Sequence, residues 1–409
     1  MNYQRHTQAI FIGSTLLTSP LGAMFSLLAF IFVKDLHATP LQIALLVSAR
    51  PIVALFSFYG NVIIKGQPGR LKSFIMGSSI LGVIPCFLFP FVNNVWFFIA
   101  ATAFFMASTR AVIPAWSEIF KINLLENERG KIYSRGSSAC YLVDIFIPLL
   151  FSPIIDSYPH SWKWIFFFLA TLQCTHLALL SLIKIKSYTD SQDPHQPYQL
   201  TSIKSIVLGP WKNCWQLMRL RPDFRKYQIV FMLGGAGLMF MQPVLPIFFE
   251  ETLKLSYTEL SGAFFFCKGV SFILFSPVWA YWLHRIPIHI FNFFVTFFAG
   301  LFGLMILGAS INLYWTYAAY VVYGVMQAGS SLSWHLAGPI FSKDKDSTLF
   351  SGVNVAMVGL RGCIAPFMGE ILFLSTNSST VFFFSSLLCF SAAAYSLMSE
   401  RSKTCPAAF

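Results

Sequence analysis

Long apolar runs, separated by short polar and basic breaks, fill the whole chain. A run of about 20 apolar residues crosses a bilayer as a helix, because a helix satisfies its own backbone hydrogen bonds in the hydrocarbon. The alternative, a β-barrel, needs alternating strands of about 10 residues, whereas 165–172 and 293–307 are apolar on nearly every face. The pattern therefore predicts an all-α polytopic membrane protein with twelve transmembrane helices, at 8–33, 41–62, 73–92, 95–118, 134–155, 164–183, 226–249, 258–282, 290–309, 314–338, 348–373 and 380–398.

Composition and charge agree with this prediction. The chain is 56% hydrophobic and 11% charged, which leaves too little polar surface to coat a globule. Its net charge of +12 could indicate a nucleic-acid partner. If the N-terminus is cytoplasmic, however, the inner segments hold 21 of the 28 Lys and Arg residues, the outer loops three and the spans four. This positive-inside distribution predicts two cytoplasmic termini and contact with anionic lipid, not nucleic acid.

The longest polar interruption divides the chain into two halves of six spans. We predict an N-terminal bundle at 1–183, a cytoplasmic central loop at 184–225 and a C-terminal bundle with a short cytoplasmic tail at 226–409. Within the loop, 211–225 mixes Trp, Leu and Met with Lys and Arg. That mixture fits an amphipathic helix on the inner membrane surface as well as it fits a plain connection.

The two halves align with each other at an offset of 217 residues. At this offset 36–39 (LHAT) meets 253–256 (LKLS), Glu118 falls on His335, and Asp144 falls on Arg361. Each match is weak alone, and chance alignment of apolar sequence is the alternative. Together the matches favour duplication, with two pseudo-symmetric bundles packed as parallel repeats.

With these features the chain resembles the major facilitator superfamily. The resemblance covers the full length and includes a family turn between spans 2 and 3, where Gly60, Lys65, Gly69 and Arg70 fit and Ile64 replaces the usual Asp. It implies a gating role for that turn. It also implies that spans 1, 4, 7 and 10 line a cavity and that spans 2, 5, 8 and 11 border the seam between the halves.

Ionisable side chains inside the spans are the candidate functional groups, because a charge at mid-membrane costs at least about 2.5–3.5 kcal/mol. Arg50, Asp144, Lys268 and Arg361 lie at similar depths near the middle of spans 2, 5, 8 and 11, and Arg110 lies in span 4. By the resemblance, the four midplane charges would meet near a central pathway. An Asp144–Lys268 pair that only fixes packing is equally open.

Four cations against one midplane carboxylate favour an anionic cargo, since Arg grips carboxylate or phosphate at two points. A polar stripe on span 10 adds Gln327 and Trp334, although such residues also serve helix packing or interfacial anchoring. The predicted substrate-binding residues are Arg50, Arg110, Lys268, Arg361, Gln327 and Trp334.

Proton coupling needs groups that titrate at accessible pH, and the candidates are Asp144, Glu118 and His335. No GxxxxGK[ST] phosphate loop, HExxH or GxSxG motif occurs in the sequence. We therefore expect no cofactor, no metal and no enzymatic activity.

The sequence thus predicts a secondary active transporter that moves a small solute, by proton coupling or exchange, through alternating access. The expected cargo is an organophosphate or a carboxylate, and the expected location is a bacterial inner membrane. Three alternatives stay open: a proton-coupled exporter of drugs or lipophilic metabolites, a transport-like sensor, and a membrane-embedded transferase. The pattern is compatible with a monomer but does not fix the oligomeric state.

Overall fold

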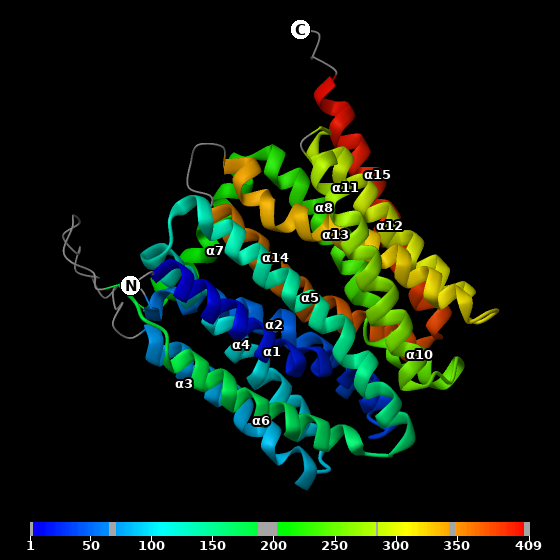
Figure 1. Ribbon diagram of the computed structural model, residues 1–409. Coiled ribbons are helices and arrows are strands. Elements are labelled where there is room, and N and C mark those ends of the chain that lie inside the picture. The colour runs from blue at the N-terminus through cyan, green and yellow to red at the C-terminus, as the bar shows by residue number, and fades with distance from the viewer. Residues whose placement is uncertain (1–2, 65–70, 187–202, 284, 343–347, 405–409) are drawn as a thin grey trace. The chain divides into compact units, whose positions relative to one another are not determined.

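The structure is a computed structural model that describes residues 3–64, 71–186, 203–283, 285–342 and 348–404. Within these residues it contains helices and no strand, as predicted (Figure 1). The helices are α1 (Tyr3–Lys34), α2 (Pro40–Ile64), α3 (Leu71–Val83), η2 (Ile84–Phe91), α4 (Val95–Asn123), α5 (Glu126–Ser157), α6 (Ser161–Ser181), α7 (Ile203–Leu220), α8 (Pro222–Met241), α9 (Val244–Ile247), η3 (Phe248–Thr252), α10 (Tyr257–Ser261), η4 (Gly262–Cys267), α11 (Lys268–Leu283), α12 (Ile288–Gly308), α13 (Tyr314–Ser342), α14 (Thr348–Ser375) and α15 (Ser378–Thr404).

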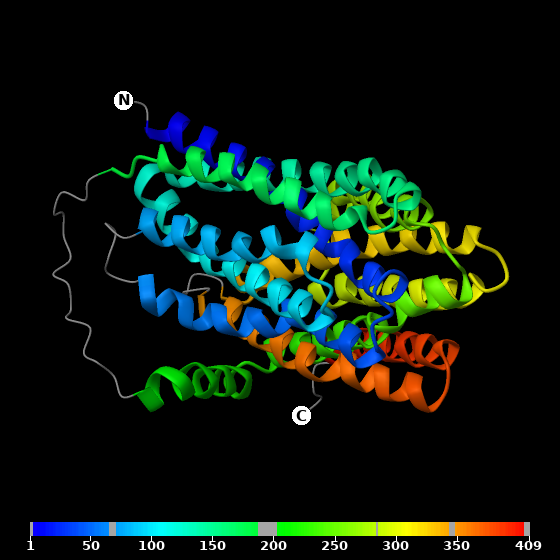
Figure 2. The same cartoon turned by 90° about the horizontal axis from the view of Figure 1, so that it is seen from below.

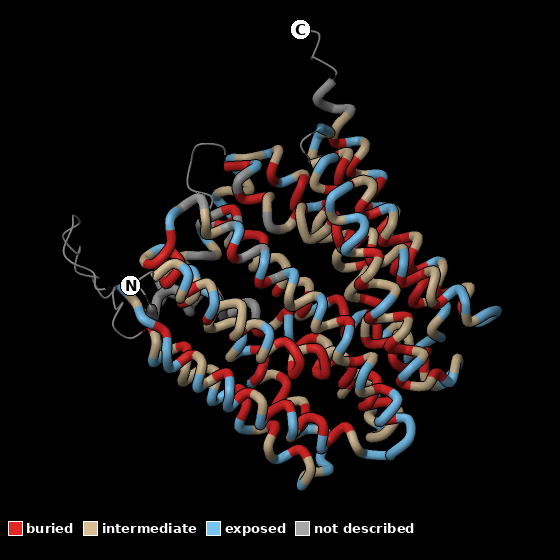
Figure 3. Tube along the Cα trace, viewed as in Figure 1, coloured by how far each residue is buried: buried red, intermediate tan, exposed pale blue. Residues whose placement is uncertain are grey.

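Ten helical stretches in the described part of the chain are long and apolar enough to cross a membrane. They coincide with ten of the predicted spans, and α2 and α13 cover the other two. Large apolar side chains such as Phe146, Leu150, Leu274 and Leu387 are 49–65% exposed. Exposed residues recur along the lengths of the helices in Figure 3. Apolar surface on this scale belongs against lipid, so the protein is an integral, multi-pass membrane protein.

Three of the spans change helix type along their length. The third runs from α3 into a 3₁₀ segment, η2, which contains Pro85 and Pro90. The seventh breaks at Gln242 and Pro243 and ends in the π-helix η3, while the eighth contains the π-helix η4 directly before Lys268. Proline removes a backbone donor, and π-turns inside helices are frequent at functional sites.

The chain forms two compact units, and the first comprises 1–37 and 56–206. In this unit α1 packs against α5 and α6, and α3 packs against α4 and α6. Aromatic rings fill its centre: Phe89 lies 4.9 Å from Phe98 and 4.8 Å from Phe166, measured between ring centroids. At one end, Asn123 Nδ2 donates to Thr7 Oγ1 at 2.8 Å and to the Lys184 carbonyl at 2.9 Å.

The second unit comprises 38–55 and 207–409. Here α8 packs against α14 and α15, and α12 packs against α13 and α15 (Figures 1 and 2). The boundary between the units near 206 falls inside the predicted central loop. The first part of α2 groups with the second unit, where Pro51 packs directly against Gly362 of α14.

The turns that follow α1 and η3 share the same local structure. His37 and Lys254 both adopt the left-handed conformation, with φ of 48° and 52°. Each turn then enters a helix through a reciprocal capping box. One box joins Thr39 to Gln42 at 2.9 and 3.4 Å, and the other joins Ser256 to Glu259 at 2.9 and 3.1 Å. Every pair is separated by the predicted offset of 217 residues, which supports two pseudo-symmetric bundles.

Inside the central segment, α7 confirms the helical alternative. The helix starts at Ile203, earlier than the predicted 211, and ends before Pro222 opens α8. Cys214 on this helix is buried, whereas Trp215 is 56% exposed with the Arg219 guanidinium 5.2 Å from its ring centroid. The position of α7 on the inner membrane surface stays a prediction.

Candidate functional site

A cavity of about 220 Å³ lies within the second unit, between α8, α12, α13 and α14. Arg361 is the one charged residue among the described residues that line it. The other polar residues of its lining are Gln242, Asn292, Thr296, Tyr323, Gln327, Ser330 and Ser333. A lining that combines apolar side chains with one guanidinium and no carboxylate suits a small ligand that carries negative charge.

Arg361 lies halfway along α14 and reaches across to α8. Its Nη1 donates to the carbonyl oxygen of Phe231 at 2.6 Å, and its Cζ lies 4.5 Å from the centroid of the Phe231 ring. Its Nε is buried and has no hydrogen-bond partner among the described residues. The guanidinium is therefore held in place by one amide oxygen and one ring, and it retains donor capacity for a ligand.

Glycines on α8 make room for these contacts. A Cβ on Gly235 would overlap the Arg361 guanidinium, and a Cβ on Gly234 would lie 2.6 Å from Thr296 Cγ2 on α12. On the side of α15, Ser385 Oγ donates to the Gly237 carbonyl at 2.6 Å. The sequence Gly234-Gly235-x-Gly237 thus lets three helices approach α8 closely, which larger residues would prevent.

A network of buried polar groups includes two residues of the cavity lining, Asn292 and Ser333. The Tyr227 hydroxyl donates to the Ser333 carbonyl at 3.2 Å, and Ser333 Oγ donates to Asn292 Oδ1 at 2.7 Å. At the residues that directly follow Tyr227 and Ser333, Gln228 Nε2 donates to Asn354 Oδ1, and Asn354 Nδ2 donates to the Trp334 carbonyl at 3.3 Å. Polar networks of this kind fix side-chain orientation in a medium of low dielectric constant.

Of the predicted substrate-binding residues, Arg361 and Gln327 both line the cavity. Arg50 belongs to the same unit, is exposed, and lies within electrostatic reach of Tyr323 in the cavity wall. Lys268 and Trp334 lie in this unit but outside the cavity lining. The ammonium of Lys268 lies 3.8 Å from the centroid of the Phe264 ring, a cation–π contact.

The remaining predicted residues that the structure describes lie in the first unit. Arg110 and Asp144 are half-buried on α4 and α5, and Cys140 Sγ donates to Asp144 Oδ2 at 3.9 Å. Glu118 Oε1 lies 3.9 Å from Lys121 Nζ in a solvent-facing pair one turn apart on α4. Convergence of Arg110 and Asp144 with the cations of the second unit stays a prediction.

The predicted gating turn lies largely beyond the structural description. Gly60 is a residue of α2, whereas Lys65, Gly69 and Arg70 lie outside the described residues. The side chain of His335, on α13, is likewise outside the description. Across the described residues, no group of three or more His, Cys, Asp or Glu side chains is placed to hold a metal ion.

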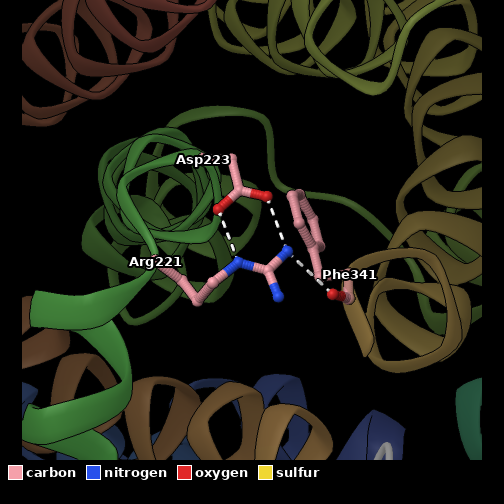
Figure 4. A network of polar contacts seen from close by, with 3 residues as sticks. All are labelled: Arg221, Asp223 and Phe341. Atoms are coloured by element: carbon pink, nitrogen blue, oxygen red, sulfur yellow. Dashed lines mark hydrogen bonds and ion pairs between the residues drawn. The ribbon is translucent and has the colours of Figure 1, made fainter. Parts of the chain in front are cut away.

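A second polar contact joins the entry of α8 to the end of α13 (Figure 4). Arg221 Nε and Nη2 donate to the two oxygens of Asp223 at 3.0 and 2.8 Å, and Nη2 also donates to the Phe341 carbonyl at 2.9 Å. The hydrogen bond with Asp223 raises the pKa of Arg221 above its ordinary value. This contact links the start of α8 to the end of α13, and its residues are not part of the cavity lining.

Sequence reasoning missed three buried polar residues, Asn292, Ser333 and Glu370. Asn292 is 5% exposed and lines the cavity, but α12 is not among the helices that the resemblance assigns to a cavity. Glu370 is 4% exposed, and its Oε2 has no hydrogen-bond partner among the described residues. The sequence does contain a signal for Glu370, a carboxylate within the apolar run 364–374. Because Glu370 lies close to the end of the predicted span 348–373, it resembles a loop residue in the sequence.

The chain matches the family model described as Major Facilitator Superfamily over residues 10–366. No curated protein matches the sequence.

Solved structures show the same fold. A POT family transporter, solved with a thioalcohol-conjugated peptide and with 5-aminolevulinic acid, superposes with a TM-score of 0.76 at 13% identity, covering 97% of this chain and 96% of its own. A mutant of the nucleoside transporter NupG gives 0.72 at 15% identity, covering 96% and 99%. The peptide transporter POT in complex with sulfate gives 0.71 at 13% identity, covering 97% and 94%.

Proposed function

The chain belongs to the Major Facilitator Superfamily and is a membrane transporter, not an enzyme; from this premise we propose that its cargo is a small organic anion, an organophosphate or a carboxylate. Transport would proceed by alternating access, with Arg361 binding the anionic group of the cargo. The observation that carries the proposal is a cavity whose lining contains a guanidinium and no carboxylate among the described residues.

Three further observations support an anion. Arg361 Nε is unpartnered among the described residues, and Arg is effectively always charged. Arg50 adds a second cation within electrostatic reach of the cavity wall. Among the similar structures, one POT transporter is in complex with sulfate, an anion, and a POT family transporter is in complex with 5-aminolevulinic acid, which carries a carboxylate beside its amine.

The test is uptake by the purified protein in proteoliposomes. A metabolite library that contains organophosphates, carboxylates, nucleosides and peptides is offered with and without an imposed pH gradient. Uptake of a phosphate or carboxylate compound is the expected result. Uptake restricted to neutral nucleosides or to drug-like cations contradicts the anion proposal and would favour one of the alternative cargo classes.

We further propose that Glu370 takes part in proton coupling, beside the predicted Asp144, Glu118 and His335. Gly369 packs against the Phe240 carbonyl, so this turn of α14 lies at the end of α8, where the seventh span breaks. A buried carboxylate without a hydrogen-bond partner is costly, and uptake of a proton removes the charge.

Glu370→Gln is therefore expected to abolish accumulation driven by a pH gradient and to preserve exchange. One pH unit can drive about tenfold accumulation per proton, and the variant should show none of it. Exchange of external cargo for preloaded cargo should continue, because that half-cycle needs no net proton movement. Gradient-driven accumulation that equals the wild-type level would exclude Glu370 as a coupling group.

We also propose that both termini face the cytoplasm of a bacterium, because the outer loops hold only Lys34, Lys163 and Lys254. In a cysteine-free background, Lys254→Cys should react with a membrane-impermeant maleimide in intact cells. Lys121→Cys, at the predicted cytoplasmic end of the fourth span, should react only after the cells are permeabilised. The reverse labelling pattern would invert the topology.

A further inference from the structure

Asn292 presents an amide to the cavity from α12. The side chain is 5% exposed, and its Oδ1 accepts a hydrogen bond from Ser333 Oγ at 2.7 Å. Its Nδ2 is buried and has no hydrogen-bond partner among the described residues. Leaving such a donor unsatisfied costs about 1–3 kcal/mol, so this amide is placed at a stability cost that a bound ligand would remove.

Two hydrogen bonds through Ser333 fix the orientation of the Asn292 amide. Tyr227 is fully buried, and its hydroxyl donates to the Ser333 carbonyl, which holds the Ser333 residue against α8. Ser333 Oγ then engages Asn292 Oδ1 and leaves Nδ2 as the available donor. One turn further along α12, Thr296 Oγ1 donates to the Asn292 carbonyl at 2.8 Å, so that hydroxyl is already engaged.

Consecutive glycines bring α12 and α14 close to the same turn of α8. Gly234 faces Thr296 of α12, and Gly235 faces Arg361 of α14. Asn292 lies one helical turn from Thr296, on the same face of α12. The cavity therefore has a cationic donor on one flank of α8 and a neutral amide donor on the other.

We propose that Asn292 determines which anions are accepted, by donating to a hydroxyl or carbonyl oxygen of the cargo distinct from the anionic group that Arg361 binds. The cargo class is then a short hydroxylated or oxo-substituted organic anion. The cavity volume of about 220 Å³ limits its size. This inference rests on the proposed function and adds to it a recognition residue on α12.

Binding of matched pairs of anions tests the inference. The purified full-length protein is titrated, with thermal stabilisation as the readout, with 3-hydroxybutyrate against butyrate and with glycerol 3-phosphate against propyl phosphate. The wild type should bind the oxygenated member of at least one pair roughly 5- to 150-fold more tightly, the range expected for one buried donor left unpaired. Asn292→Leu should bind both members of that pair equally, and Arg361→Gln should bind both about 10- to 150-fold more weakly than the wild type.

Two further variants keep the test sharp. Ser333→Ala retains the amide but removes the hydrogen bond that orients it, so it should reduce the preference even if Asn292→Leu fails to fold. Ser386→Ala removes a buried hydroxyl of α15 that donates to the Phe382 carbonyl away from the cavity, and it should leave the preference unchanged.

The outcomes separate the two proposals. Equal affinity of the wild type for both members of each pair, or an undiminished preference in Asn292→Leu and Ser333→Ala, overturns the role of Asn292 and leaves the anion transporter intact. Absence of binding for all four anions overturns the stated cargo class. If the uptake screen also shows only neutral cargo, the proposed function itself fails.

Discussion

Replacing Arg361 by Gln is expected to lower the rate of anion uptake about 10- to 150-fold while the protein still folds. Hydrogen bonds to charged groups contribute about 1.5–3 kcal/mol each, and every 1.4 kcal/mol is about tenfold. Gln ends near the position of the Arg361 Nε, so it keeps an uncharged amide on α14 but removes both the charge and the Nη1 donor that contacts the Phe231 carbonyl at 2.6 Å. Initial rates in proteoliposomes, at matched protein content, measure the effect.

Arg285→Gln is the matched control. The Arg285 guanidinium also stacks on a ring, 4.1 Å from the centroid of Tyr281, and belongs to the same unit, but it lies outside the cavity lining. Its uptake rate should equal that of the wild type. A second route to the same loss is Gly235→Ala, because the added methyl group would displace the guanidinium without removing its charge. Wild-type uptake by both Arg361→Gln and Gly235→Ala would exclude Arg361 from cargo binding.

Gly369→Ala is expected to destabilise the second unit by about 1–3 kcal/mol, the usual cost of overpacking. A Cβ on Gly369 would overlap the carbonyl oxygen of Phe240. That neighbour is backbone and cannot rotate away, so α14 and α8 would have to separate. The melting temperature in detergent, and the fraction of protein that stays monodisperse, report the loss.

Gly77→Ala provides the comparison for this substitution. Gly77 is also inside a helix, α3, and a Cβ there would meet no atom within 4 Å. Alanine is favoured over glycine in helices by about 1 kcal/mol, so Gly77→Ala should keep or raise the melting temperature. Equal melting temperatures for the two variants would show that the α8–α14 contact tolerates a methyl group.

The helices of this fold were predictable from the sequence because a bilayer imposes one length scale on every apolar run. All twelve predicted spans coincide with helices, with ends displaced by a few residues. The exception is α5, which begins at Glu126, earlier than the predicted 134. Its first turns carry Arg129, Lys131 and Arg135, whose polarity hid the helix from an argument based on hydropathy.

The sequence indicates the duplication through a constant offset between the halves. The structure adds matching helix caps and backbone conformations, which matches between apolar residues cannot provide. Thr39 and Ser256 are both helix N-caps, with Gln42 and Glu259 at the reciprocal positions. Capping depends on side-chain chemistry rather than on hydropathy. His37 and Lys254 also occupy the same left-handed backbone region, which non-glycine residues enter infrequently.

The site was only partly predictable. Arg361 and Gln327 were found because charged and amide groups are conspicuous in apolar runs. Asn292 and Ser333 were missed because their importance lies in a contact between α12 and α13, and hydropathy does not show which faces of two buried helices meet. The role of Gly235 as the space for the Arg361 guanidinium also depends on helix packing, which the sequence does not show.

The charge of Arg361 in the cavity lining has a consequence for energetics across the membrane. When an anion enters a cavity whose described lining holds one cation and no carboxylate, the occupied site becomes neutral, while the empty site stays positive. A unit charge that crosses the full transmembrane voltage changes energy by about 2.3 kcal/mol per 100 mV. Voltage should then act mainly on the return of the unloaded carrier, so that the resting potential sets the rate of this return while the loaded step is electrically silent.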